Sequence, residues 1–265
     1  MTEWNASEYA RISTLQAAMA EEVLALLDLK GNERILDVGC GNGKTTAEIA
    51  ARVPQGAVVG VDASADMIAF AAAHGAFHAN LQFAVADARQ LPYQHEFDLV
   101  VSFNALHWIP DQDRALRSIR ATLKHTGLAQ LRLVPKGQRK SLEDVLEETR
   151  LSSRWISYFQ SIRDPYLHLA PEQYGELAKQ NGFDVRRVQI GAKAWDFQSR
   201  SAFLAFGGVT FVEWTQHLPE SDRLDFAIDV LDRYRRVACD APGEENYFRF
   251  YQMDITLAPA NPRPD

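Results

Sequence analysis

Residues Ile35 to Gly43 read ILDVGCGNG, and this stretch decides the fold. Its apolar start predicts a buried strand, and three glycines at alternate positions predict a tight turn. Helix-forming sequence follows at once, from Lys44 to Ala51. A strand, a glycine turn and a helix form the first unit of a nucleotide-binding α/β fold. In the dinucleotide pattern the third glycine stands three residues after the second. Here it comes one residue early, at Gly43, so the loop departs from the NAD pattern.

Strands and helices alternate along the rest of the chain. Apolar runs bounded by turn residues predict further strands, and helical patterns lie between them. The expected strands are 57–61, 81–85, 97–103, 128–134, 185–190 and 248–257, and the expected helices are 13–28, 67–79, 114–123 and 220–238. This rhythm implies βαβ units and a mainly parallel sheet. The pair Gly207-Gly208 should break or bend a helix that begins near Ser201.

The glycine loop, which follows Asp37, resembles motif I of the class I S-adenosylmethionine (SAM) dependent methyltransferases. Other landmarks of that family follow in order after the second, third and fourth strands. The resemblance implies a Rossmann-like seven-stranded sheet, mainly parallel with an antiparallel last strand and helices on both faces. It also implies SAM as cofactor and S-adenosyl-L-homocysteine as product. The residues that it assigns to the cofactor are Asp37, Gly39, Gly41, Gly43, Asp62, Ala63, Asp87, Ala88 and Asn104.

Two of these acids have a plainer alternative. Asp62 lies 19 residues beyond Gly43, where a nucleotide fold places the carboxylate that binds ribose hydroxyls. The alternative for Asp62 is a cap on the next helix. The resemblance places Asp87 near the adenine amino group, and the alternative is a surface turn residue. Cys40, within the loop, is interpreted as a small buried residue rather than a reactive thiol.

The composition agrees with a soluble enzyme formed by one domain, residues 1–265. The chain has 35 acidic and 28 basic side chains and a net charge of −7, which argues against a broad nucleic-acid interface. Two cysteines provide no disulfide framework, and no apolar run reaches the ~20 residues that span a bilayer. No signal peptide is evident. We therefore expect a cytoplasmic monomer or weak homodimer, with no metal and no membrane or nucleic-acid partner.

Two segments lie outside the core pattern. The first is an N-terminal cover, residues 1–28, in which Trp4 and Tyr9 precede an amphipathic helix. The second is residues 136–181, a helical stretch rich in aromatics at the carboxyl end of the sheet, interpreted as a lid over the substrate. The alternative for both segments is simple packing against the core. The candidate substrate-binding residues of the lid are Tyr158 and Tyr166.

Three short stretches narrow the resemblance: EWNASEY at the start, ALHWIPD after the fourth strand, and WTQHLPESD before the long helix. They are similar to the trans-aconitate methyltransferases, one group of small-molecule carboxyl methyltransferases. That similarity implies that Trp4 and Tyr9 close over SAM and that His107 and Trp108 face the methyl group. The chain departs from the group after the fifth strand, where LRLVPKGQRKS (131–141) replaces a more apolar exit.

A carboxylate acceptor sets the expected mechanism. The sulfonium methyl is already activated and a carboxylate is ionised at neutral pH, so an in-line displacement needs alignment rather than a base. The alternative acceptor is an aromatic or apolar natural product, methylated on O, N or C with His107 as the catalytic base. A role of His107 in the core is as well supported by the sequence. A nicotinamide-dependent oxidoreductase and a non-catalytic SAM-binding protein are the other classes that the sequence leaves open.

Overall fold

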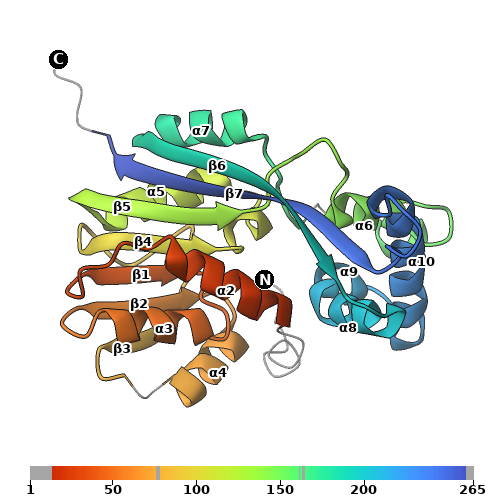
Figure 1. Cartoon of the computed structure of the whole chain (residues 1–265), viewed down its shortest axis with the longest axis horizontal. Coiled ribbons are helices and arrows are strands. Elements are labelled where there is room, and N and C mark those ends of the chain that lie inside the picture. Colours follow the sequence, from red (N-terminus) through yellow and green to blue (C-terminus); the bar gives the residue numbers. More distant parts are fainter. Residues whose placement is uncertain (1–13, 76–77, 161, 163–164, 261–265) are drawn as a thin grey trace.

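The computed structural model of the chain describes residues 14–75, 78–160, 162 and 165–260. Its centre is a seven-stranded sheet in the order β3-β2-β1-β4-β5-β7-β6 (Figure 1). The strands are β1 Arg34–Val38, β2 Ala57–Asp62, β3 Leu81–Val85, β4 Phe97–Phe103, β5 Leu123–Leu133, β6 Phe183–Asp196 and β7 Tyr247–Pro259. Neighbours from β3 to β5 pair in parallel, whereas β7 is antiparallel to both β5 and β6. The predicted sheet, mainly parallel with an antiparallel last strand, is confirmed.

Helices cover both faces of this sheet because its central strands are apolar on both sides. The helices beside the sheet are α2 Thr14–Ala25, α3 Lys44–Arg52, α4 Ala65–Gly75, α5 Gln112–Thr122 and α7 Pro171–Gln180. Successive residues of a strand point to opposite faces. Ile35 of β1 accordingly packs in a cluster with α2 and α3, and Leu36 packs in a cluster with α5 and α7.

The order of the strands creates a crevice at their carboxyl ends. β1 is followed in sequence by β2 on one side, while β4 pairs with it on the other. Where the strand order reverses, the loops diverge to the two faces of the sheet and leave room for a ligand. The ends of β1, β2, β3 and β4 lie at this edge, and the glycine loop follows β1 there.

A second hydrophobic core lies beside the sheet, at the right of Figure 1. We call the elements that form it the helical unit: α6 Leu142–Arg150, the short 3-10 helix η2 Ile156–Tyr158, α8 Arg200–Thr210, α9 Val212–Thr215 and α10 Glu220–Ala238. β7 joins the two cores, since Phe248 and Phe250 pack in the helical unit whereas Ile255 and Leu257 pack in the sheet. The chain enters this unit twice, so no linker marks it in the sequence.

The segment 136–181, expected to be one lid, is divided between the two cores. Leu146 of α6 packs in the core of the helical unit. Tyr174 and Ala178 of α7 are instead fully buried in the core of the sheet. α7 is therefore a helix that covers the sheet before β6, and only the part before it belongs with the helical unit.

The glycine pair at 207 and 208 does not break its helix, contrary to the expectation from sequence. α8 continues to Thr210. A Cβ on Gly207 would lie 2.8 Å from a ring carbon of Phe211, whereas a Cβ on Gly208 would meet no atom within 4 Å. The close packing of the Phe211 ring explains Gly207. The loss of helix propensity at a glycine, about 1 kcal/mol, is small beside the burial of an aromatic ring.

Candidate functional site

A cavity of ≈ 500 Å³ opens at the carboxyl ends of β1, β2, β3 and β4. This volume lies in the range of cofactor and small-molecule sites. The loops after the four strands line one side of it, α2 lines another, and Pro165 and Glu213 line it from the side of the helical unit. The predicted site residues among its lining are Gly39, Gly41, Asp62, Ala63, Asp87, Ala88, Asn104 and Trp108.

The three glycines of the loop have φ values of +76°, +54° and +74°, a backbone conformation that favours glycine. A Cβ on Gly39 would lie 2.2 Å from the Cβ of Ala105, and one on Gly43 would lie 2.6 Å from the ring of Phe83. Gly43 supports the start of α3 and lies outside the lining of the cavity. Gly41 does line the cavity, and a Cβ there would meet no protein atom within 4 Å. The loop thus packs closely against the protein at Gly39 and Gly43, and it faces the open space of the cavity at Gly41.

Asp62 joins the loop to the next helix. Its Oδ2 accepts a hydrogen bond from the Gly41 N–H, at 2.9 Å, and its Oδ1 accepts one from the Ser64 N–H, also at 2.9 Å. The alternative role, capping α4, falls to Ser64, whose Oγ accepts from the Met67 N–H at 3.2 Å. Because an ionised carboxylate has about four acceptor positions, Asp62 retains capacity for the hydroxyls of a ligand.

Asp37 supports the loop from behind rather than lining the cavity. The carboxylate is 3% exposed and accepts a hydrogen bond from the Thr46 hydroxyl at 2.7 Å. Burial, with a smaller contribution from the charge of Asp62, raises the pKa of Asp37 to about 7. Cys40, predicted to be buried, is half-buried and lines the cavity. Burial raises the pKa of its thiol well above its usual range, so this thiol is neutral.

The other two lining loops present an ion pair and a strained asparagine. Both carboxylate oxygens of Asp87 accept hydrogen bonds from Arg89, at 2.6 to 3.0 Å, and this guanidinium lowers the pKa of Asp87. Asn104 has a φ of +57°, and its Oδ1 is buried without a hydrogen-bond partner among the described residues. A buried acceptor at the wall of a cavity fits a ligand that donates a hydrogen bond there.

His107 and Trp108 lie on different sides of the cavity wall. Trp108 lines the cavity and packs edge-on against Trp214 of the helical unit, with ring centroids 6.2 Å apart. His107 is 3% exposed and lies behind Trp108, outside the lining. Burial, with a contribution from His168, lowers the pKa of His107 well below its usual range. The imidazole is therefore neutral, but the structure does not bring it to the cavity as a base.

The predicted aromatic residues of the lid are also outside this cavity. Tyr158 is exposed on η2 and donates a hydrogen bond to Asp222 at 2.8 Å. Tyr166 donates to Asp144 at 3.2 Å and packs against Trp108, so it supports the wall from behind. Trp4 and Tyr9, the aromatics of the N-terminal cover, lie outside the described residues.

The residues that sequence reasoning missed include three from α2 and one from α9. Met19, Ala20 and Val23 line the cavity, within the N-terminal segment that was predicted to be a cover. Glu213 lies in α9, for which the sequence offers no comparable signal. Arg89, in the loop after β3, is a further residue that was missed: it lines the cavity and pairs with Asp87 at 2.6 Å.

A chain of charges attaches α2 to the sheet. Arg132 of β5 is 3% exposed and binds both carboxylate oxygens of Asp254 on β7, at 2.6 and 2.8 Å. Its Nη1 also donates to Glu22 of α2 at 3.2 Å. Glu22 accepts two further hydrogen bonds from Lys193 of β6, at 2.8 Å each. Glu22 of α2 thus has partners on two strands, β5 and β6, and Asp254 of β7 orients the first of them.

The donor set of the cavity fits an organic cofactor better than a metal. Among the residues that the structure describes, no group of three histidine, cysteine or acidic side chains is arranged to hold a metal ion. The open space beside Gly41, the carboxylate of Asp62 and the unpaired Asn104 oxygen suit a nucleoside with an attached amino acid group. Within the described part of the chain, no helix has the length and apolar character needed to cross a membrane.

Comparisons with known proteins agree with this geometry. Residues 35–127 match the model of a methyltransferase domain family. The chain is 29% identical over 259 residues to trans-aconitate 2-methyltransferase of Deinococcus radiodurans, covering 94% of this chain and 96% of that protein.

Solved structures share the fold. The YcgJ protein of Bacillus subtilis superimposes with a TM-score of 0.66 at 19% identity, over 93% of this chain and all of that one. Phosphoethanolamine N-methyltransferase 2 of Haemonchus contortus, in complex with S-adenosyl-L-methionine, has a TM-score of 0.62 at 20% identity, over 96% of this chain and 56% of that one.

Proposed function

We propose that this chain, a class I SAM-dependent methyltransferase, transfers the methyl group to a carboxylate of a small molecule. The observation that carries the proposal is the similarity to trans-aconitate 2-methyltransferase, which extends over 94% of the chain and includes the helical unit as well as the sheet. The predicted alternative of a nicotinamide-dependent oxidoreductase is not supported, because the matched family is one of methyltransferases.

The lining residues have distinct roles in this proposal. Gly41 lets the backbone approach the cofactor, Asp62 binds the ribose hydroxyls, and Asn104 accepts a hydrogen bond from the amino acid group of SAM. Ala88 is apolar and buried, so it suits the adenine ring. SAM supplies an activated methyl group when it is bound, so the protein has to align the acceptor and exclude water.

The position of His107 favours an acceptor that needs no base. A phenol or an amine must lose a proton during transfer, and His107 was the predicted base for it. The imidazole is buried behind Trp108 and outside the lining. A carboxylate is already ionised at neutral pH. Trp108 then provides an apolar wall for the body of the acceptor. This wall lies next to the helical unit, on whose side Glu213 and Pro165 also line the cavity.

Methylation of a defined panel tests this proposal. The protein is incubated with isotopically labelled SAM and with trans-aconitate, simple aliphatic and aromatic carboxylic acids, and the amide and alcohol analogue of each. We expect label in products that lose it on mild alkaline hydrolysis, as methyl esters do, and no label in the amides and alcohols. An alkali-stable product would contradict the carboxylate acceptor. Binding of SAM without transfer to any acceptor, including those of a cell extract, would support the non-catalytic alternative.

A further inference from the structure

A second, smaller cavity of ≈ 110 Å³ lies between the exit of β5, the start of α6 and strands β6 and β7. Its lining includes none of the residues assigned above to SAM or to the acceptor. The cationic side chains of the lining are Lys136, Arg139, Lys140, Lys193 and Arg249. Asp144 is a carboxylate in the same lining, and His168 adds an imidazole. Lys140 and Lys193 are paired with Glu148 and Glu22, so the cations considered for a ligand are Lys136, Arg139 and Arg249. Their positive charge attracts anions.

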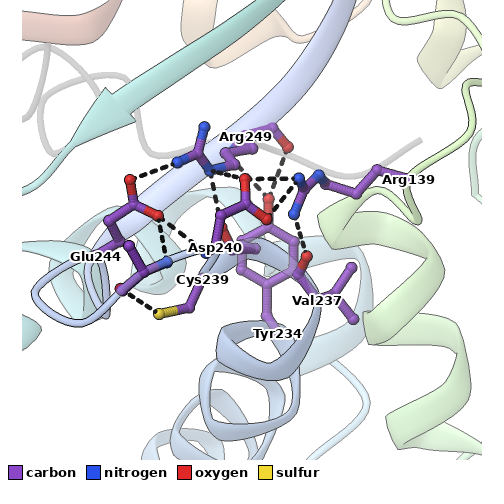
Figure 2. A network of polar contacts seen from close by, with 9 residues as sticks. Arg139, Tyr234, Val237, Cys239, Asp240, Glu244 and Arg249 are labelled. Atoms are coloured by element: carbon purple, nitrogen blue, oxygen red, sulfur yellow. Dashed lines mark hydrogen bonds and ion pairs between the residues drawn. The ribbon is translucent and has the colours of Figure 1, made fainter.

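Carboxylates just after the end of α10 hold the two arginines of the lining, Arg139 and Arg249, in place (Figure 2). Arg139 Nη2 donates to both oxygens of Asp240 at 2.8 Å, and Arg249 donates from Nη2 to Glu244 at 2.9 Å. Arg249 Nε also donates to the Ala238 carbonyl, at 2.8 Å. A guanidinium has five N–H donors, so each arginine keeps donors beyond these bonds. Because the side chains are already ordered, binding an anion costs them little conformational entropy.

His168 gives an independent indication of a ligand. Its Nε2 is buried and has no hydrogen-bond partner among the described residues. A buried polar atom without a partner is rare and calls for an explanation such as a bound ligand. The ring of His168 lies 5.7 Å from that of His107, which in turn lies 5.4 Å from Trp108. The two cavities are thus separated by this row of rings.

The unusual exit of β5 forms one wall of the second cavity. The resemblance to the trans-aconitate methyltransferases led us to expect a more apolar stretch here, and this chain instead has Lys136, Arg139 and Lys140. A Cβ on Gly137 would lie 2.0 Å from the Tyr251 ring, so the loop packs flat on β7. Arg139 of this stretch is half-buried, whereas Lys136 and Lys140 are exposed where they line the cavity.

We propose that this second cavity binds a small dianionic oxyanion, phosphate or a short dicarboxylate, at a site separate from the methyl-transfer site. The guanidiniums of Arg139 and Arg249 and the ammonium of Lys136 provide charge-assisted hydrogen bonds to its oxygens, and His168 Nε2 provides a further contact. The proposal is independent of the acceptor of the methyl group.

Calorimetric titration of the full chain with inorganic phosphate and, separately, with malonate tests the proposal. S-adenosyl-L-homocysteine is kept saturating so that the donor cavity is occupied, and ionic strength is held constant with sodium chloride. We expect one saturable site for at least one of the two anions. Lys136→Gln and Arg139→Gln should each weaken binding about tenfold, the effect of losing one charge-assisted hydrogen bond. Lys179→Gln, an equal change of charge at an exposed position of α7, should leave the affinity unchanged.

The outcomes separate cleanly. Saturable binding of phosphate alone assigns a tetrahedral anion, and binding of malonate alone assigns a dicarboxylate. Absence of saturable binding for both anions overturns the proposal. An equal loss of affinity in Lys179→Gln would also overturn the proposal, because the anion would then respond to the general charge of the surface. Lys136 is exposed, so its variant tests the site even if Arg139→Gln, which removes bonds to Asp240 and to the Val237 carbonyl, weakens the fold.

Discussion

At the scale of single residues, Asp62 has the most exacting role in the cavity. Its carboxylate holds the glycine loop and the start of α4 while facing the cofactor side. Asp62→Ala should therefore raise the dissociation constant for SAM by at least about tenfold, because it removes charge-assisted hydrogen bonds worth about 1.5–3 kcal/mol each. Isothermal titration calorimetry measures the change, and Asp66→Ala, an exposed acid in the same helix, is the control. An unchanged affinity would remove Asp62 from the site.

Asp37 gives the protein a pH-dependent stability. Its pKa is about 7 in the folded chain against an ordinary value of 3.8, so between these pH values the folded state holds a proton that the unfolded state has lost. Stability from this group is therefore present at low pH and is lost as pH rises toward 7.

The side chain of Asp37→Asn is neutral in the folded and the unfolded state, so this variant does not lose stability through this group as the pH rises. Its free energy of unfolding, relative to the native protein, should rise by about 2–3 kcal/mol between pH 5 and pH 8. Urea denaturation at the two pH values measures the difference. Asp28→Asn, at an exposed position, should show no such trend, and a parallel pH dependence of native protein and Asp37→Asn would show that Asp37 ionises normally.

At the scale of elements, α2 depends on one exposed carboxylate. Glu22 binds Arg132 and Lys193, whereas its neighbour Glu21 is exposed on the same helix. Glu22→Gln should speed hydrogen exchange of the α2 amides and weaken SAM binding a few-fold, because Met19 and Val23 line the cavity. Glu21→Gln is the matched control. Equal exchange rates in the two variants would mean that packing and the hydrogen bond from Arg52 to the Leu24 carbonyl hold α2 without Glu22.

The two adjacent glycines of α8 make an internal comparison. Gly208→Ala adds a methyl group in open space within a helix, so it should stabilise the protein by up to about 1 kcal/mol. Gly207→Ala places a Cβ against the Phe211 ring and should destabilise it by about 1–3 kcal/mol. Chemical denaturation measures both. Stabilisation by both substitutions would show that the Phe211 ring moves aside at little cost in free energy.

The elements that the sequence predicted well are those whose signal is local. The strand and glycine loop from Ile35 to Gly43 stand where they were expected, and α10 has the predicted bounds. The limits of α7 and the division of 136–181 between two cores depend on contacts with distant strands, which periodicity does not reveal. For the same reason His107 and Tyr158 were candidates by position in the sequence, although the fold buries one and turns the other outward.

At the scale of the whole molecule, cofactor binding adds to stability. A ligand at 100 times its dissociation constant stabilises the folded state by about 2.7 kcal/mol. For a chain of this size S-adenosyl-L-homocysteine should then raise the melting temperature by roughly 5–10 °C in a thermal scan. NAD should produce no shift, and Asp62→Ala should lose most of the shift. A larger shift with NAD would contradict the assignment of the cofactor. The expectation of a monomer or weak homodimer stays a prediction.

The long ladder between β6 and β7, with one register shift between Val185 and Arg187, limits how the molecule can open. Its pairing runs from Phe183 opposite Pro259, in the sheet, to Asp196 opposite Tyr247, beside the helical unit. A two-stranded ribbon bends less readily than a single-chain linker. We therefore expect the helical unit to keep its position beside the sheet. The same arrangement lets mutations reshape the acceptor wall while the donor side keeps its geometry, which would make the fold readily adaptable to new acceptors.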